Sequence, residues 1–246
     1  PKSMEFYKDI KFFEKEFGGI MPLEILIDTK KEKGVMKLST LKKMDKINDA
    51  IETFPELSKP ISVVNLVKYS KQAYYKGNPK YYQLPTNQEQ SYIFSYTKNS
   101  NSEAGMLKNF VDSTGRYARI TTFMKDIGTD KMDVIQERLK AVIAKEFPSD
   151  KYTVTITGKA LVFIKGTNYL IKNLVLSLSL AIILIALFMA WMFRSPQMIL
   201  ISLLPNILPL LITAGLMGFL DIPIKPSTIL VFSIAFGIPS YYSLVF

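Results

Sequence analysis

An apolar run at residues 174–193, in which only Ser177 and Ser179 are polar, constrains this chain more than any other feature. A helix of this length, rising about 1.5 Å per residue, crosses the roughly 30 Å hydrocarbon core of a bilayer. Two more apolar stretches follow, separated by short turns. We therefore predict an all-α bundle of three transmembrane helices, at about 170–193, 198–220 and 227–246.

Charge is distributed unevenly along the chain. After residue 168 the charged residues are Lys172, Arg194, Asp221 and Lys225. We therefore expect two domains, a polar domain at 1–168 and a membrane domain at 169–246. The chain has 31 Lys and Arg against 21 Asp and Glu. Basic and acidic residues alternate, as at 14–16 and 30–33, which indicates a mixed solvated surface and no nucleic-acid partner.

The sequence contains neither His nor Cys. Nucleophiles paired with histidine, thiol redox centres and ordinary zinc sites all need these residue types. We also find no glycine-rich phosphate loop and no paired-carboxylate spacing. We therefore expect no enzyme activity, no metal and no cofactor.

In the polar domain, segments with the hydrophobic pattern of strands alternate with segments that have the pattern of helices. Residues 23–28, 117–125 and 152–157 read as strands, and 107–111 reads as a partner strand before a turn at 113–116. Apolar stripes predict helices from about 40 to 54 and from 130 to 146. The order strand, helix, strand, strand, helix, strand is the split βαβ pattern. We predict a four-stranded α+β ferredoxin-like domain with both helices on one face.

An insertion of helical character, at about 58–100, interrupts this pattern. Residues 60–76 read as a helix that ends at Gly77. The insertion is rich in aromatic residues: Tyr69, Tyr74, Tyr75, Tyr81, Tyr82, Tyr92, Phe94 and Tyr96. Two interpretations stay open, a groove for a lipid-like ligand and ordinary packing.

The later membrane stretches contain unusual residues. Pro205 and Pro209 each remove a backbone donor, and Asn206 places an amide near mid-membrane. Such residues are tolerated where neighbouring helices or a wet cavity satisfy the freed groups. This predicts a kinked span that either packs on other helices or contacts substrate. Ser233 and Gly237 form a small pair that permits close helix packing.

Several motifs carry a family resemblance: Phe-Gly-Gly-Ile-Met-Pro-Leu-Glu-Ile at 17–25, Leu-Pro-Asn-Ile-Leu-Pro-Leu at 204–210, Lys-Pro-Ser-Thr at 225–228 and Phe-Gly-Ile at 236–238. The chain resembles MMPL-type exporters of the resistance, nodulation and division (RND) superfamily. Its membrane helices also resemble those of sterol-sensing-domain proteins.

The resemblance implies a periplasmic porter domain followed by the second, third and fourth helices of a multi-pass protein of the bacterial inner membrane. The first helix and a second half of the same transporter would then be missing, and the chain would be a fragment truncated at both ends. Such proteins use the proton gradient to export lipids and other hydrophobic or amphiphilic molecules, so the expected partners are membrane lipids and such a substrate.

One position departs from the family pattern. The resemblance implies a proton-carrying Asp four residues after Gly237, but this position is Tyr241. A phenol, with an ordinary pKa of about 10, stays protonated at physiological pH. Either the protein is a non-pumping relative with a sensing or scaffolding role, or the final residues differ from those of the intact protein. Tyr242 and Ser240 are the neighbouring candidates for a proton-relay position.

Overall fold

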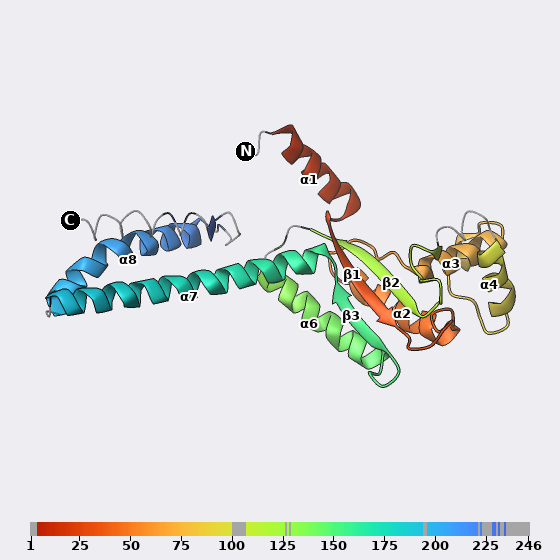
Figure 1. Cartoon of the computed structure of the whole chain (residues 1–246). Coiled ribbons are helices and arrows are strands. Elements are labelled where there is room, and N and C mark those ends of the chain that lie inside the picture. Colours follow the sequence, from red (N-terminus) through yellow and green to blue (C-terminus); the bar gives the residue numbers. More distant parts are fainter. Residues whose placement is uncertain are drawn as a thin grey trace. The chain divides into compact units, whose positions relative to one another are not determined.

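The computed structural model describes residues 4–99, 107–125, 127, 129–193, 196–220, 222, 228, 229, 231 and 234. Its contacts divide the chain into unit 1, Pro1–Val162, and unit 2, Phe163–Phe246. The elements of unit 1 are α1 (Glu5–Phe17), β1 (Met21–Asp28), α2 (Leu38–Glu52), α3 (Val63–Tyr74), the short 3₁₀ helix η1 (Pro79–Tyr81), α4 (Gln90–Asn99), β2 (Tyr117–Met124), α6 (Thr129–Glu146) and β3 (Thr153–Thr157). Two long helices follow, α7 (Lys159–Phe193) and α8 (Pro196–Phe219) (Figure 1).

Unit 1 is built on a three-stranded antiparallel sheet of order β2-β1-β3. Ile25 of the central strand lies opposite Ile120 on one side and Ile156 on the other. Leu23, Ile25 and Ile27 are fully buried, whereas Leu26 is exposed. Alternation along β1 therefore sends every second side chain into the core, as strand geometry requires.

Two helices supply the other half of this core. The apolar stripe of α2 is buried at Leu41, Met44, Ile47 and Ile51, and that of α6 at Met132, Ile135 and Leu139. The two helices contact each other. An ion pair of 2.9 Å between Lys46 and Glu146 also joins them. The predicted helices at 40–54 and 130–146 are thus confirmed to within a few residues.

The predicted strand at 107–111 is wrong. Leu107 is helical, the next residues form a turn, and Val111 makes a single bridge to Ala118. The edge of β2 is taken instead by residues 56–61, whose Ser58 N–H donates to the Phe123 carbonyl at 2.7 Å. Ile61 exchanges two bonds with Thr121, of 2.8 and 2.9 Å. Between these contacts lies Pro60, which lacks an N–H and so prevents a continuous ladder.

The insertion folds as α3, η1 and α4 and contributes no strand in its described residues. Ser62 begins α3 with a capping box, because its hydroxyl accepts from Val64 N–H at 3.2 Å and Asn65 Oδ1 accepts from Ser62 N–H at 2.9 Å. Capping of this kind satisfies backbone donors that have no partner inside the helix. The predicted helix at 60–76 is therefore present, with a later start.

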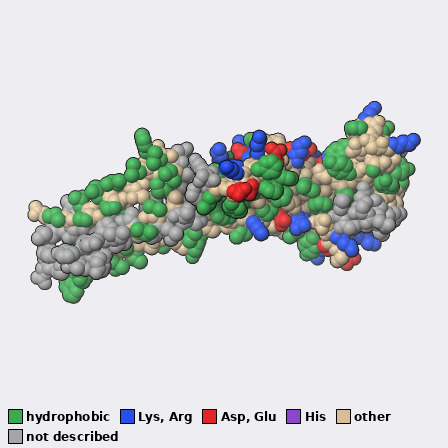
Figure 2. All heavy atoms as spheres, turned by 90° about the horizontal axis from the view of Figure 1, so that it is seen from above, with side chains coloured by type: hydrophobic (Ala, Val, Ile, Leu, Met, Phe, Trp, Pro, Cys, Tyr) green, Lys and Arg blue, Asp and Glu red, His purple; other side chains and the backbone are tan. Residues whose placement is uncertain are grey.

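Unit 2 consists of apolar helices. The stretch Lys159–Trp191 of α7 is long and apolar enough to cross a membrane, and among the described residues it is the one helix that is. Leu176, Leu187 and Trp191 of α7 are 65%, 62% and 78% exposed. Figure 2 shows charged side chains gathered over unit 1, whereas α7 and α8 present mainly hydrophobic ones. Exposed apolar surface of this extent is typical of a membrane or protein contact.

Candidate functional site

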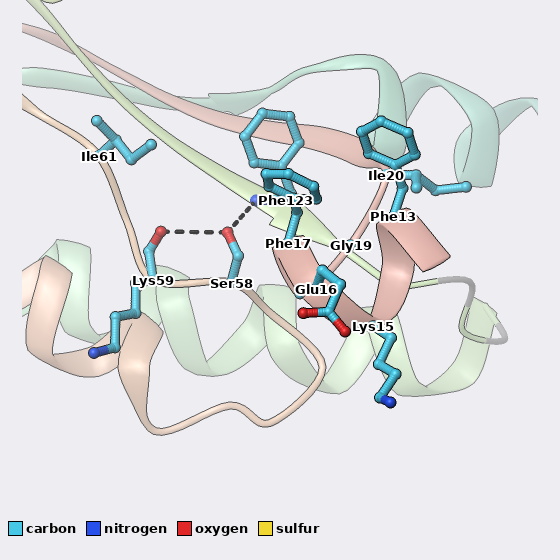
Figure 3. A pocket seen from close by; sticks show the side chains of 11 residues that line it. Phe13, Lys15, Glu16, Phe17, Gly19, Ile20, Ser58, Lys59, Ile61 and Phe123 are labelled. Carbon is cyan, nitrogen blue, oxygen red and sulfur yellow. Dashed lines mark hydrogen bonds between the residues drawn. The ribbon is translucent and has the colours of Figure 1, made fainter. Parts of the chain in front are cut away.

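A cavity of unit 1 lies where α1 joins the sheet. It has a volume of about 720 Å³ and is open to the surface. Its walls come from the end of α1, the link into β1, residues 58–61 and one residue of β2 (Figure 3). The lining residues are Phe13, Lys15, Glu16, Phe17, Gly18, Gly19, Ile20, Ser58, Lys59, Ile61 and Phe123. We refer to this cavity as the α1 pocket.

Two glycines shape the base of the α1 pocket. Gly18 ends α1 with a left-handed backbone, φ 74°, a conformation that glycine adopts without steric cost. At Gly19 an added Cβ would lie 2.5 Å from the Met124 carbonyl carbon. A side chain at Gly19 is therefore incompatible with the close approach of this link to β2. The Ile20 N–H bond to the Met124 carbonyl, 3.1 Å long, fixes that approach.

Ser58 fixes the opposite wall. Its hydroxyl accepts from Phe123 N–H at 2.9 Å, and its carbonyl accepts from the Thr122 hydroxyl at 2.7 Å. These bonds hold residues 58–61 against β2 without regular strand structure. The wall of the pocket formed by residues 58–61 is therefore held in place by hydrogen bonds to the sheet.

The pocket combines aromatic rings with charges at its margin. The Phe13 and Phe17 rings stack with centroids 5.2 Å apart, and the two side chains are 52% and 59% exposed. The Lys15 and Lys59 side chains extend away from the rings (Figure 3). An apolar chain with a polar end suits this arrangement, because the rings offer apolar contact and the charges stay in water.

Sequence reasoning did not identify this pocket. Phe6, Phe13 and Phe17 lie at helical spacing in α1, which is the signal of an amphipathic helix. No side chain of α1 is buried. The two glycines entered the prediction only through the family resemblance.

The tyrosine-rich insertion is explained by packing. The Tyr75 and Tyr81 rings stack at 4.1 Å, and Tyr74 contacts Tyr92 and Tyr96 at 5.2 and 5.7 Å. Tyr69 meets Tyr82 edge-on at 4.8 Å. Aromatic pairs prefer such stacked and edge-to-face geometries. Of the two interpretations of these residues, the structure favours mutual packing.

A buried ion pair supports the same insertion. Lys71 of α3, whose side chain is 3% exposed, donates to Glu89 at 2.7 Å. Tyr75 Oη donates to the other Glu89 oxygen at 2.9 Å, and Thr86 N–H also donates to Glu89. Burial alone would raise the pKa of Glu89, but these donors outweigh it and lower the pKa to about 2. The carboxylate is therefore charged at neutral pH and acts structurally.

Of the predicted site residues in the membrane domain, the structure describes Pro205, Pro209 and the backbone of Asn206. Pro205 and Pro209 lie inside α8, which continues through both. The Thr213 hydroxyl donates to the Pro209 carbonyl at 2.7 Å. Asn206 is helical, and its side chain lies outside the described atoms. The predicted packing and proton-relay residues also lie outside the described residues: Ser233, Gly237, Ser240, Tyr241 and Tyr242.

The described residues include no group of three His, Cys, Asp or Glu side chains that could hold a metal ion. The chain thus joins an α+β unit with an apolar pocket to a helix long and apolar enough to cross a bilayer. The model of the MMPL family matches residues 33–245, so the chain belongs to the MMPL family. It is thus an RND-type protein, from a family of membrane transporters and related proteins. No individual curated protein matches the chain.

Proposed function

We propose that this chain forms part of a proton-driven exporter that moves lipids or other hydrophobic or amphiphilic molecules across the bacterial inner membrane. The observation that carries the proposal is the MMPL match, which extends from the polar unit through both apolar helices. Because the match includes most of the polar unit, it supports a role in transport for that unit as well as for the helices.

In this proposal unit 1 is a porter domain of ferredoxin-like type on the periplasmic side. Supporting this, β1 lies between β2 and β3 and is antiparallel to both, as the first strand of a split βαβ fold is. The missing edge strand corresponds to the irregular residues 56–61. Three transmembrane helices would follow, with α7 and α8 as the first two.

The α1 pocket is the proposed contact for the apolar part of the substrate. Phe13, Phe17 and Phe123 line it, and Lys15 and Lys59 stand at its margin. An amphiphile of either head-group charge can pair there, because Glu16 also lines the pocket. The pocket is part of the porter domain and is not itself a proton site.

Proton coupling through the third membrane helix is proposed to depend on the residue at position 241. A carboxylate buried in the membrane costs about 2.5 to 3.5 kcal/mol on insertion scales, so it persists where it has a function or a partner. A second half of the same transporter would supply that partner. The Tyr241→Asp variant of the complete protein is then expected to insert no better than the wild type.

A second candidate function is a non-pumping membrane protein of the same architecture, with a sterol-sensing-like or scaffolding role. The observation in its favour is Tyr241 itself, since a phenol does not release a proton at physiological pH. This candidate predicts ligand binding without gradient-dependent movement.

The test is to reconstitute the complete protein containing this chain in vesicles and to compare it with its Tyr241→Asp variant. If Tyr241 replaces the proton carrier, a pH gradient should accelerate amphiphile movement by the Asp form more than by the Tyr form. Equal, gradient-dependent rates would move the proton site to another residue. Rates that a protonophore leaves unchanged in both forms would favour the non-pumping alternative.

A further inference from the structure

A second, smaller cavity lies at the opposite end of β1 from the α1 pocket. Its volume is about 170 Å³, room for several groups of water size, each of which takes about 30 Å³ in the liquid. It is lined by Thr29, Lys31, Gly34, Lys37, Ser39, Thr40, Lys151 and Tyr152. None of these described lining residues is acidic, and three of them are lysines.

The N-terminus of α2 opens into this cavity. Lys37 is the N-cap, and no side chain caps the helix. Thr40 and Leu41 N–H donate to the Lys37 carbonyl, at 2.9 and 3.0 Å. Leu38 and Ser39 N–H, which precede them, have no acceptor among the described residues. Free amides and the positive end of a helix dipole form a favourable environment for an anion.

An independent observation at the same place is the Thr40 side chain. Thr40 is only 1% exposed, yet its hydroxyl has no hydrogen-bond partner among the described residues, and the residue lines the cavity. The side chains of most buried polar residues are hydrogen-bonded within the protein or to a ligand or water that reaches them. The neighbouring Thr29 hydroxyl is already occupied, at 2.9 Å from the Lys31 and Arg116 carbonyls. Thr40 therefore brings to the cavity lining a hydroxyl that no described residue engages.

The loop beside the cavity carries lysines and also Glu32, which is not among the lining residues. A Cβ on Gly34 would lie 2.2 Å from Thr29 Oγ1, so the loop passes too close for any side chain there. The nearest carboxylate along the strand, Asp28, is engaged by Arg116 through two bonds of 2.7 Å. The lysine charges at the cavity are thus not neutralised by Asp28.

We propose that this cavity binds a phosphate group, through the Leu38 and Ser39 amides, the Thr40 hydroxyl and the charges of Lys31, Lys37 and Lys151. Tetrahedral oxyanions accept several donors at once, which matches this convergence of N–H, O–H and ammonium groups. The group belongs either to a free phosphate or to an anionic lipid head group. The inference does not depend on transport and stands apart from the proposed function.

The decisive variant is Thr40→Val, which removes the hydroxyl and keeps the shape of the side chain. Phosphate affinity should fall about tenfold, the range expected for losing a hydrogen bond to a charged group. The unfolding temperature without ligand should stay the same or rise, because valine has no polar atom to bury. A purely structural role for Thr40 would instead lower that temperature and leave affinity unchanged.

Binding is measured with the 246-residue chain in detergent, by titration calorimetry, in two arms. One arm uses inorganic phosphate, and the other uses short-chain phosphatidylglycerol below its micelle concentration. If inorganic phosphate binds saturably and Thr40→Val weakens that binding, the ligand is a free anion. If only phosphatidylglycerol binds in this way, the ligand is a lipid head group. Lys151→Gln should weaken binding too, whereas Lys140→Gln, an exposed change on α6, should not.

Either of two results would overturn the proposal. The first is an absence of saturable binding in both arms at millimolar ligand. The second is binding that Thr40→Val and Lys151→Gln leave unchanged, because the ligand would then be held elsewhere.

Discussion

At the scale of single residues, two ion pairs of unit 1 differ in what surrounds them. Lys71 is buried and its partner Glu89 accepts from three side chains or backbone groups. The Arg116 side chain is 40% exposed, and its guanidinium donates one hydrogen bond to each carboxylate oxygen of Asp28. Breaking a buried pair leaves an uncompensated charge, whereas an exposed pair is weakened by water and salt.

Glu89→Gln should destabilise unit 1 by about 3 kcal/mol, because buried Lys71 loses its counter-charge. Urea unfolding followed by circular dichroism measures this loss. The control is Glu137→Gln on the exposed side of α6, which should change stability by less than about 0.5 kcal/mol. Similar effects of the two variants would mean that the Lys71 pair does not stabilise the insertion.

Asp28 gives a pH-dependent prediction. The Arg116 hydrogen bonds hold the pKa of Asp28 at about 2, below its ordinary value of 3.8. Because the folded pKa is the lower one, the stabilisation is complete above about pH 4 and is lost as pH falls toward 2. Asp28→Asn should therefore cost about 1 kcal/mol at pH 7, a value reduced for exposure of the arginine. Unfolding at pH 7 and pH 2.5 checks this, since the difference from wild type should shrink in acid.

At the scale of elements, hydrophobic periodicity predicts the strand and the helices whose apolar faces are buried in the core. The alternation of β1 and the apolar stripes of α2 and α6 are local patterns, and all three elements lie where these patterns place them. The strand expected at 107–111 failed for a local reason. The Phe110 and Val111 N–H groups both donate to the Leu107 carbonyl, at 3.0 and 2.9 Å, so the backbone curls where an extended strand was expected. The turn predicted at 113–116 is present, and the Asp112 carboxylate accepts there from Tyr117 N–H at 2.7 Å and Thr114 N–H at 3.1 Å.

The link between α1 and β1 gives an element-scale prediction. Gly19→Ala should destabilise unit 1 by about 1 to 3 kcal/mol, since the new Cβ forces the link away from β2. Gly166→Ala in α7 is the control, because nothing lies within 4 Å of its Cβ position and alanine favours a helix. Thermal unfolding of both variants measures the difference. An unchanged Gly19→Ala protein would show that the close approach to Met124 does not position α1.

At the scale of the whole molecule, composition predicts two parts, but no local pattern predicts the pocket. Uneven charge and apolar runs predict a polar domain at 1–168 and a membrane domain at 169–246, and the contacts of the structure divide the chain after Val162. The α1 pocket joins Phe17, Ser58 and Phe123, which are far apart in the chain. Their proximity follows from the register of β2 and the bonds of Ser58, which no local pattern reveals. The predicted residues 233–242 stay predictions.

The central claim is that the α1 pocket handles the apolar part of a substrate moved by the proton gradient. The most direct measurement is the rate at which the complete protein, in vesicles, moves a fluorescent amphiphile with and without a protonophore. The same rates are measured for two variants of α1. Phe17→Ser changes a residue that lines the α1 pocket, and Phe12→Ser changes an equally exposed residue that does not line it. The account predicts gradient-dependent movement that the protonophore abolishes, slowed several-fold by Phe17→Ser and little by Phe12→Ser. Movement that persists with the protonophore, or equal rates for the two variants, would contradict it.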